Sequence, residues 1–82
     1  MADWKEIITA DSEVMAGKPV IIGTRLTVEF IVERLADGWS EEDLLKSYPG
    51  LTHEQIHACL RYAAAMLSEV QMYSLPLARR RA

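Results

Sequence analysis

The sequence predicts a mainly α domain of the α+β class, in which an N-terminal β-hairpin leads into a three-helix bundle with helix-turn-helix order, homeodomain-like or winged-helix-like. Three observations predict this fold. Two short β-branched runs precede Gly23, three segments with helical apolar spacing follow it, and a proline–glycine turn separates the last two segments. We expect residues 1–73 to form one domain and residues 74–82 to form a basic C-terminal tail.

The predicted hairpin consists of strands at residues 6–9 and 20–22, each bounded by turn-forming residues. Between them, Asp11 is suited to capping a single helical turn and Gly17 to ending it. A two-stranded hairpin is only marginally stable in water by itself. We therefore expect the two strands to pack against a helix or against strands of a second chain.

Capping residues mark the first two predicted helices. Thr27 is a good N-cap for a helix that Gly38 ends. Ser40 and Asp43 form a near capping box, which predicts a short second helix that continues to Ser47.

The third helix has the best-specified start in the chain. Proline and glycine in residues 48–51 stop the preceding helix. Thr52 and Gln55 then form a full capping box, and no strong helix breaker occurs before Pro76. We expect this helix to run to about Tyr73.

Two apolar stripes run along this third helix. The first, expected to face the core, contains Ile56, Leu60, Ala63, Leu67 and Val70. The second contains Cys59, Tyr62, Met66 and Tyr73. The helix is either a large core element or a dimer interface along its C-terminal half. We favour a homodimer, with candidate interface residues Tyr62, Met66, Val70 and Tyr73.

Composition restricts the class of protein. Half of the 82 residues are apolar, which is typical of a folded domain. The single cysteine, Cys59, excludes an internal disulfide framework, fits a reducing compartment, and is interpreted as a small core residue. No apolar run is long enough to span a bilayer, and the first six residues lack the order of a signal peptide. We expect a soluble, cytoplasmic protein.

Nucleic-acid binding is an ambiguous expectation for this chain. Its formal net charge is −3, and an anionic protein is repelled by phosphates unless its basic groups gather on one face. With Ile56 inward, the outward residues of the third helix are Glu54, His57, Ala58, Arg61 and Ala65. The candidate DNA contacts are Arg61, His57, Arg25, Lys18 and Arg34. Arg25 has a second interpretation, in which it pairs with a carboxylate or bonds to exposed carbonyls.

Residues 53–57, His-Glu-Gln-Ile-His, match the H-E-x-x-H pattern of zinc proteases. A catalytic zinc needs a third protein ligand, and Ala63 stands where the extended pattern has a third histidine. Glu69 lies roughly 18 Å further along the predicted helix than the histidine pair, too far to act as the third ligand. We therefore interpret residues 53–57 as a solvated first helical turn, with adventitious metal binding as the lesser alternative, and we assign no catalytic residue, metal or cofactor.

A family resemblance is carried by residues 17–28, Gly-Lys-Pro-Val-Ile-Ile-Gly-Thr-Arg-Leu-Thr-Val. Further matching positions are Gly38, Tyr48, Pro49, Leu51, Thr52, Ile56, Leu60, Tyr62 and Ala63. On these residues the chain resembles a small bacterial family, domain-of-unknown-function family 433, from about Ile7 to Ala64. The resemblance implies a homeodomain-like or winged-helix-like fold, and it implies a PIN-like ribonuclease toxin as partner, because some members are called VapB-type antitoxins. The family has no established catalytic residues to carry over.

The resulting prediction is a non-enzymatic, antitoxin-like protein that binds a PIN-like toxin and operator DNA. The alternatives are a stand-alone DNA-binding regulator and a protein-interaction module that does not meet DNA. Neither a membrane nor a small-molecule substrate is expected. In the tail, Arg79, Arg80 and Arg81 are candidate contacts to the acidic metal site of the toxin, and the alternative is a solubilising tail that attracts nucleic acid.

Overall fold

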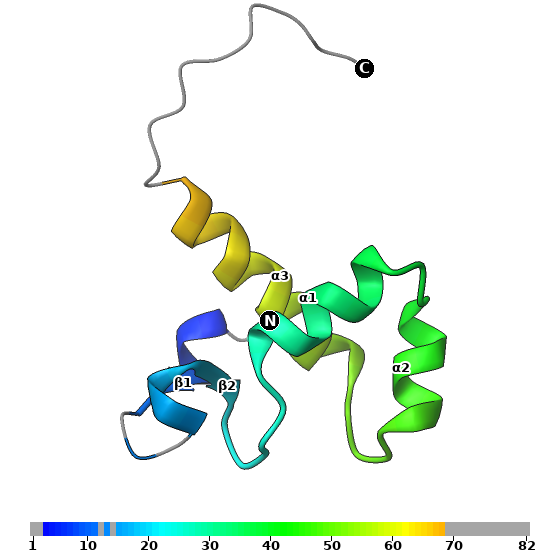
Figure 1. The fold of residues 1–82 in the computed structure, drawn as a ribbon, viewed down its shortest axis with the longest axis horizontal. Coiled ribbons are helices and arrows are strands. Elements are labelled where there is room, and N and C mark those ends of the chain that lie inside the picture. Colours follow the sequence, from blue (N-terminus) through cyan, green and yellow to red (C-terminus); the bar gives the residue numbers. More distant parts are fainter. Residues whose placement is uncertain (1–2, 12, 14, 69–82) are drawn as a thin grey trace, which may run out of the picture.

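A computed structural model describes residues 3–11, 13 and 15–68, and it has the predicted fold class (Figure 1). The elements in chain order are η1 (Trp4–Glu6), β1 (Ile8–Ala10), η2 (Met15–Gly17), β2 (Pro19–Ile21), α1 (Val28–Ala36), α2 (Glu41–Ser47) and α3 (His53–Leu67), where η marks a 3-10 turn. A two-stranded antiparallel hairpin therefore precedes three helices. Within the described ranges, no helix combines the length and the apolar character needed to cross a bilayer.

The hairpin pairs Ile8 with Ile21 and Ala10 with Pro19. β1 starts two residues later than predicted because Glu6 belongs to η1, which Asp3 caps by accepting a hydrogen bond from the backbone N–H of Lys5. The helical turn predicted between the strands exists as η2, and Gly17 ends it in the left-handed region, with φ of 83°.

The role predicted for Asp11 is different in the structure. Its carboxylate accepts a hydrogen bond of 2.8 Å from the backbone N–H of Glu13, so it closes a local turn. The 3-10 turn η2 begins only at Met15, beyond the reach of a cap at this position. Asp11 is therefore a turn residue rather than a helix cap.

The caps predicted for α1, α2 and α3 are all formed. Thr27 accepts a hydrogen bond from the N–H of Phe30 at the start of α1. Gly38 follows α1 with φ of 100°, which lets the N–H of Trp39 donate to the carbonyl oxygen of Arg34 at 3.0 Å. Both remaining helices begin with complete capping boxes, Ser40 with Asp43 and Thr52 with Gln55.

The core lies where the hairpin and all three helices meet. Its largest fully buried side chains come from four elements: Ile21 of β2, Ile31 of α1, Leu44 of α2, and Ile56 and Cys59 of α3. In the view of Figure 1, the hairpin and α2 lie on opposite sides of α1 and α3. The predicted packing of the strands on helices is confirmed, because β1 packs against α3 and β2 against α1.

The buried face of α3 differs from the predicted one. Leu60 and Leu67, expected to face the core, are 39% and 68% exposed. Ala58, expected to point outward, is buried, and Ala65 is half-buried. The helix is therefore turned so that its Cys59 side is covered.

An aromatic contact at the N-terminus covers part of the second apolar stripe of α3. The rings of Trp4 and Tyr62 meet edge to face, with centroids 5.1 Å apart and planes at 84°. Because η1 packs on α3, it covers a stripe that the helices alone would leave open. The helical spacing of apolar residues could not reveal this contact, since Trp4 lies outside every periodic segment.

The C-terminal predictions concern residues that are not described. α3 is described to Leu67, with Ser68 as its C-cap. The expected continuation to Tyr73, the interface candidates Val70 and Tyr73, and the tail with Arg79, Arg80 and Arg81 lie outside the described residues.

Candidate functional site

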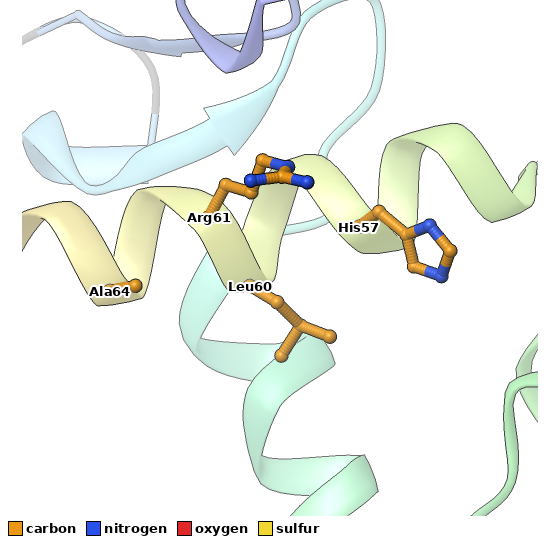
Figure 2. Close-up of a pocket in the computed structure, with 4 residues that line it drawn as sticks. All are labelled: His57, Leu60, Arg61 and Ala64. Atoms are coloured by element: carbon orange, nitrogen blue, oxygen red, sulfur yellow. The ribbon is translucent and has the colours of Figure 1, made fainter. Parts of the chain in front are cut away.

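The outward face of α3 carries a shallow, largely apolar hollow. Four side chains from consecutive turns of α3 line it: His57, Leu60, Arg61 and Ala64 (Figure 2). We call this surface the α3 groove; its volume is about 290 Å³. The exposed Leu67 lies one turn beyond Ala64 and two turns beyond Leu60 on the same helix. The face combines apolar side chains with two groups that can be cationic.

Two of the predicted DNA contacts are occupied within the chain. The ammonium group of Lys18 lies 3.1 Å from the carboxylate of Glu29. The guanidinium group of Arg34 donates to the carboxylate of Asp37 at 2.8 Å and lies over the rings of Phe30 and Trp39. The guanidinium carbon is 5.2 Å from the centroid of the first ring and 5.8 Å from that of the second. These two groups are committed to local contacts.

Arg25 and Arg61 are different, because each is exposed and makes no hydrogen bond or ion pair within the described ranges. The carboxylate or carbonyl partner considered for Arg25 is therefore not found there. Thr24, which the sequence reasoning missed, closes this loop instead: its hydroxyl donates to the carbonyl oxygen of Ile21 at 2.8 Å and accepts from the N–H of Leu26 at 3.0 Å.

The first turn of α3 meets the first residue of α2 in a cluster that we call the α2–α3 corner, defined by Glu41, His53 and His57. Nδ1 of His53 lies 2.7 Å from Oε1 of Glu41, and Nε2 of His57 lies 3.2 Å from Oε2 of the same carboxylate. An ionised carboxylate only accepts hydrogen bonds, so each of these ring nitrogens donates its N–H. One donor atom from each residue lies within 4.8 Å of the other two.

Glu41 is the acidic partner that sequence reasoning missed. It lies 12 residues before His53 on another helix, so no local motif contains it. The hydrogen bond from His53 lowers the pKa of the Glu41 carboxyl below its ordinary value. Desolvation opposes this shift, and the contact with His57 adds to the lowering. The turn at residues 53–57 is therefore exposed to solvent, as expected, but both of its histidines contact the Glu41 carboxylate.

A second carboxylate adds negative charge to the start of α3. Oε2 of Glu42 lies 3.6 Å from Nε2 of His53, on the side of the ring opposite to Glu41. Glu54 lies in the first turn of the same helix. Phosphate groups approaching the N-terminal half of α3 would therefore meet carboxylates, although this is the half that a helix-turn-helix protein normally presents to base edges.

The family model described as "Protein of unknown function (DUF433)" matches residues 8–63. The chain belongs to the DUF433 family. This DUF433 chain is 35% identical over 65 residues to an uncharacterized protein, y4eO, from Sinorhizobium fredii. That match covers 79% of the chain and only 29% of the relative, so the chain spans less than a third of the relative's length.

A crystal structure of a DUF433 member from Anabaena variabilis has a similar fold. The TM-score is 0.72 at 30% sequence identity, with 77% of this chain and 62% of that chain covered. The family match begins at β1, so it leaves out Trp4 and includes every residue of the α2–α3 corner and the first three residues of the α3 groove. Both surfaces therefore lie in or next to the family region.

The predicted dimer contacts of this DUF433 chain have mixed environments. Tyr62 is half-buried against Trp4, so much of its ring is already covered within the chain. Met66 is 42% exposed and is available for a further contact. The oligomeric state remains a prediction.

Proposed function

We propose that this DUF433 chain is a non-enzymatic, antitoxin-like protein that binds a PIN-like ribonuclease through the α3 groove. The observation that supports a binding role is the groove itself, in which Leu60 is exposed beside Arg61 on a regular helix face. Exposed apolar side chains that cluster on one helix face are typical of protein-interaction sites. The partner class is the one that the family resemblance implies.

The charge distribution favours a protein partner over DNA as the main ligand. Lys18 and Arg34 are neutralised within the chain, and His57 contacts Glu41. An arginine next to apolar side chains suits a partner surface with carboxylates, because a guanidinium group binds a carboxylate through two parallel hydrogen bonds. The metal-binding clefts of PIN-like ribonucleases are rich in such carboxylates.

A co-purification experiment with a PIN-like ribonuclease tests this proposal. Leu60→Glu should weaken the complex by at least about tenfold, equivalent to about 1.4 kcal/mol, because a charge would replace an apolar contact. Ile22→Glu is the matched control, since Ile22 is an exposed apolar residue on the hairpin side of the domain. Equal affinity of the two variants would argue against the groove as the contact.

We also propose that the protein acts as a homodimer. Met66 extends the exposed apolar surface beyond the groove, and one 82-residue chain leaves that surface uncovered within the described ranges. Light scattering at micromolar concentration should give twice the 9.3 kDa chain mass. A Met66→Glu variant should move the mass toward the monomer, whereas a wild-type monomer would contradict this part of the proposal.

Operator binding is the second candidate, supported by Arg25 and Arg61, which are exposed and have no ion-pair partner among the described residues of this hairpin and three-helix fold. Arg61→Ala should weaken binding to the operator by about 1–3 kcal/mol if this side chain reads a base. Affinity should also fall steeply with salt, because phosphate contacts release counterions. Unchanged operator affinity of Arg61→Ala would remove α3 as the reading helix.

A further inference from the structure

We propose that the α2–α3 corner binds a divalent transition-metal ion, with Zn²⁺ as the ion that its chemistry fits best. Two imidazoles and one carboxylate are ligands that zinc accepts readily, and this combination of three protein ligands leaves a fourth position open. The inference is independent of the proposed function, because it rests only on Glu41, His53 and His57.

The spacing of the donor atoms already approaches that of a tetrahedral site. Zinc–nitrogen and zinc–oxygen bonds of about 2.0–2.1 Å place two tetrahedral ligands about 3.3 Å apart. The nitrogens of His53 and His57 lie 2.7 and 3.2 Å from the oxygens of Glu41, and a donor atom of each residue lies within 4.8 Å of the others. Because all three side chains are on the surface, small rotations suffice to bring the donors around one ion.

The backbone that carries these ligands is fixed on both sides. Glu41 directly follows the Ser40 N-cap of α2, and His53 directly follows the Thr52 N-cap of α3. Each cap belongs to a complete capping box, which holds the chain direction at the start of its helix. His57 is one turn further along α3, four residues after His53, and so lies on the same face. The site is therefore largely preorganised.

Glu42 supplies a contact that orients zinc-binding histidines in many proteins. A histidine that binds metal through one ring nitrogen commonly offers its other N–H to a carboxylate. Nε2 of His53 lies 3.6 Å from Glu42, whereas Nδ1 faces Glu41. On metal binding the ring proton of His53 would move from Nδ1 to Nε2, which leaves the Nδ1 lone pair for the metal and keeps the imidazole neutral. The ring proton of His57 would move from Nε2 to Nδ1 in the same way, so that both nitrogens now facing Glu41 can bind the ion.

The local charge also favours a cation. With histidine counted as neutral, the carboxylates of Glu41 and the neighbouring Glu42 place negative charge beside both imidazoles, which attracts cations. An ion here would connect α2 to α3 across the turn at residues 48–52. It would also restrain His57, which lines the α3 groove.

The exposure of the corner distinguishes this proposal from a zinc-protease site. The side chains of His53 and His57 are 53% and 52% exposed, so they do not form a water-excluding pocket around a substrate. The corner is therefore proposed as a binding and bridging site. Zinc should produce no peptide cleavage in a protease assay.

Calorimetric titration of the tag-free 82-residue chain with zinc chloride, after treatment with a chelator, tests the proposal. One ion per chain should bind, and zinc should raise the melting temperature. Glu41→Gln and His57→Gln should each weaken binding by about 10–100-fold, because each removes one of three ligands. Glu33→Gln is the matched control, as it removes an exposed carboxylate on α1 without touching the corner.

Each outcome bears on the proposal. Wild-type binding that Glu33→Gln leaves unchanged and Glu41→Gln weakens would support it. Equal binding by wild type and Glu41→Gln would overturn the three-ligand site, since the histidine pair alone would then hold the ion. Absence of zinc binding by the wild type would overturn it outright. Far-ultraviolet circular dichroism of each variant, which should match the wild type, keeps the comparison independent of folding.

Discussion

Two clusters of charged and polar side chains on this domain differ in how their charges are balanced. At the end of α1, Arg34 bonds to Asp37 and stacks over Phe30 and Trp39, so positive charge, negative charge and aromatic surface are all supplied locally. At the α2–α3 corner, one carboxylate is shared by two histidines and a second carboxylate stands behind them. The first cluster pairs a permanently charged guanidinium group with one carboxylate, whereas the second places two carboxylates beside imidazoles.

This difference separates structural from binding roles. Arg34 is only 30% exposed and packs over the rings of Phe30 and Trp39, as expected of a structural side chain. Its Nε is buried with no hydrogen-bond partner in the described part of the chain, a cost that these contacts have to offset. The corner has exposed imidazole nitrogens and a carboxylate that could bind a metal ion. A basic residue in a helix-turn-helix sequence is therefore a weak indicator of DNA contact until its local partners are known.

The largest effect should come from removing an aromatic side chain of the first cluster. Phe30→Ala should lower the free energy of unfolding by about 2–3 kcal/mol, somewhat less than a fully buried phenylalanine, because the ring is half-buried. It would remove the surface under Arg34 and the edge-to-face contact with Tyr48, whose ring centroid is 5.5 Å away. Urea denaturation measures this value. A loss below that of Arg34→Met would contradict the ranking.

A smaller loss is expected when only the charge of the first cluster is removed. Arg34→Met keeps the apolar stem and removes the pair with Asp37 and the cation–aromatic contacts, which should cost about 1–2 kcal/mol. The same denaturation experiment measures it, with Glu33→Met as an exposed neighbour that should change stability by less than about 0.5 kcal/mol. If the two variants were equally stable, the first cluster would not be a structural unit.

Without metal, the second cluster should contribute less than the first. Glu41→Gln should lower the free energy of unfolding by no more than about 0.5 kcal/mol in the presence of a chelator, because exposed ion pairs are weak. Denaturation with and without zinc would sharpen the comparison, since the wild type should gain stability and the variant should not. A loss in chelator as large as that of Arg34→Met would show that the corner is structural by itself.

The smallest effect of these variants is expected on the rate at which a thiol reagent labels Cys59. This residue is buried in the core and belongs to neither cluster. Burial raises the pKa of its thiol to about 12, so thiolate is scarce at pH 8 and labelling by a thiol reagent should be slow in the native state. Labelling should rise strongly in urea and little in Glu41→Gln. The labelling rate of Phe30→Ala should lie between that of Glu41→Gln and that of the chain in urea. Rapid labelling of the native wild type would contradict the burial of Cys59 in the core.

The sequence alone determined the order of the hairpin and the three helices and the residues at which the helices begin. Caps and breakers act within four or five residues, so Thr27, Gly38 and the two capping boxes could be recognised from neighbouring positions. The core position of Cys59 and the exposure of His57 and Arg61 also followed from helical spacing. The H-E-x-x-H spacing predicted correctly that two imidazoles share one face of α3.

Only the tertiary structure decided which surfaces are available. The face of α3 that is buried depends on how the hairpin, α1 and η1 pack against it, and the third donor of the α2–α3 corner depends on how α2 meets α3. Likewise, Lys18 is paired with a residue 11 positions away. Contacts between segments distant in sequence depend on packing geometry, which local propensity and periodicity do not encode, and for this reason the helices were predictable while the binding surfaces were not.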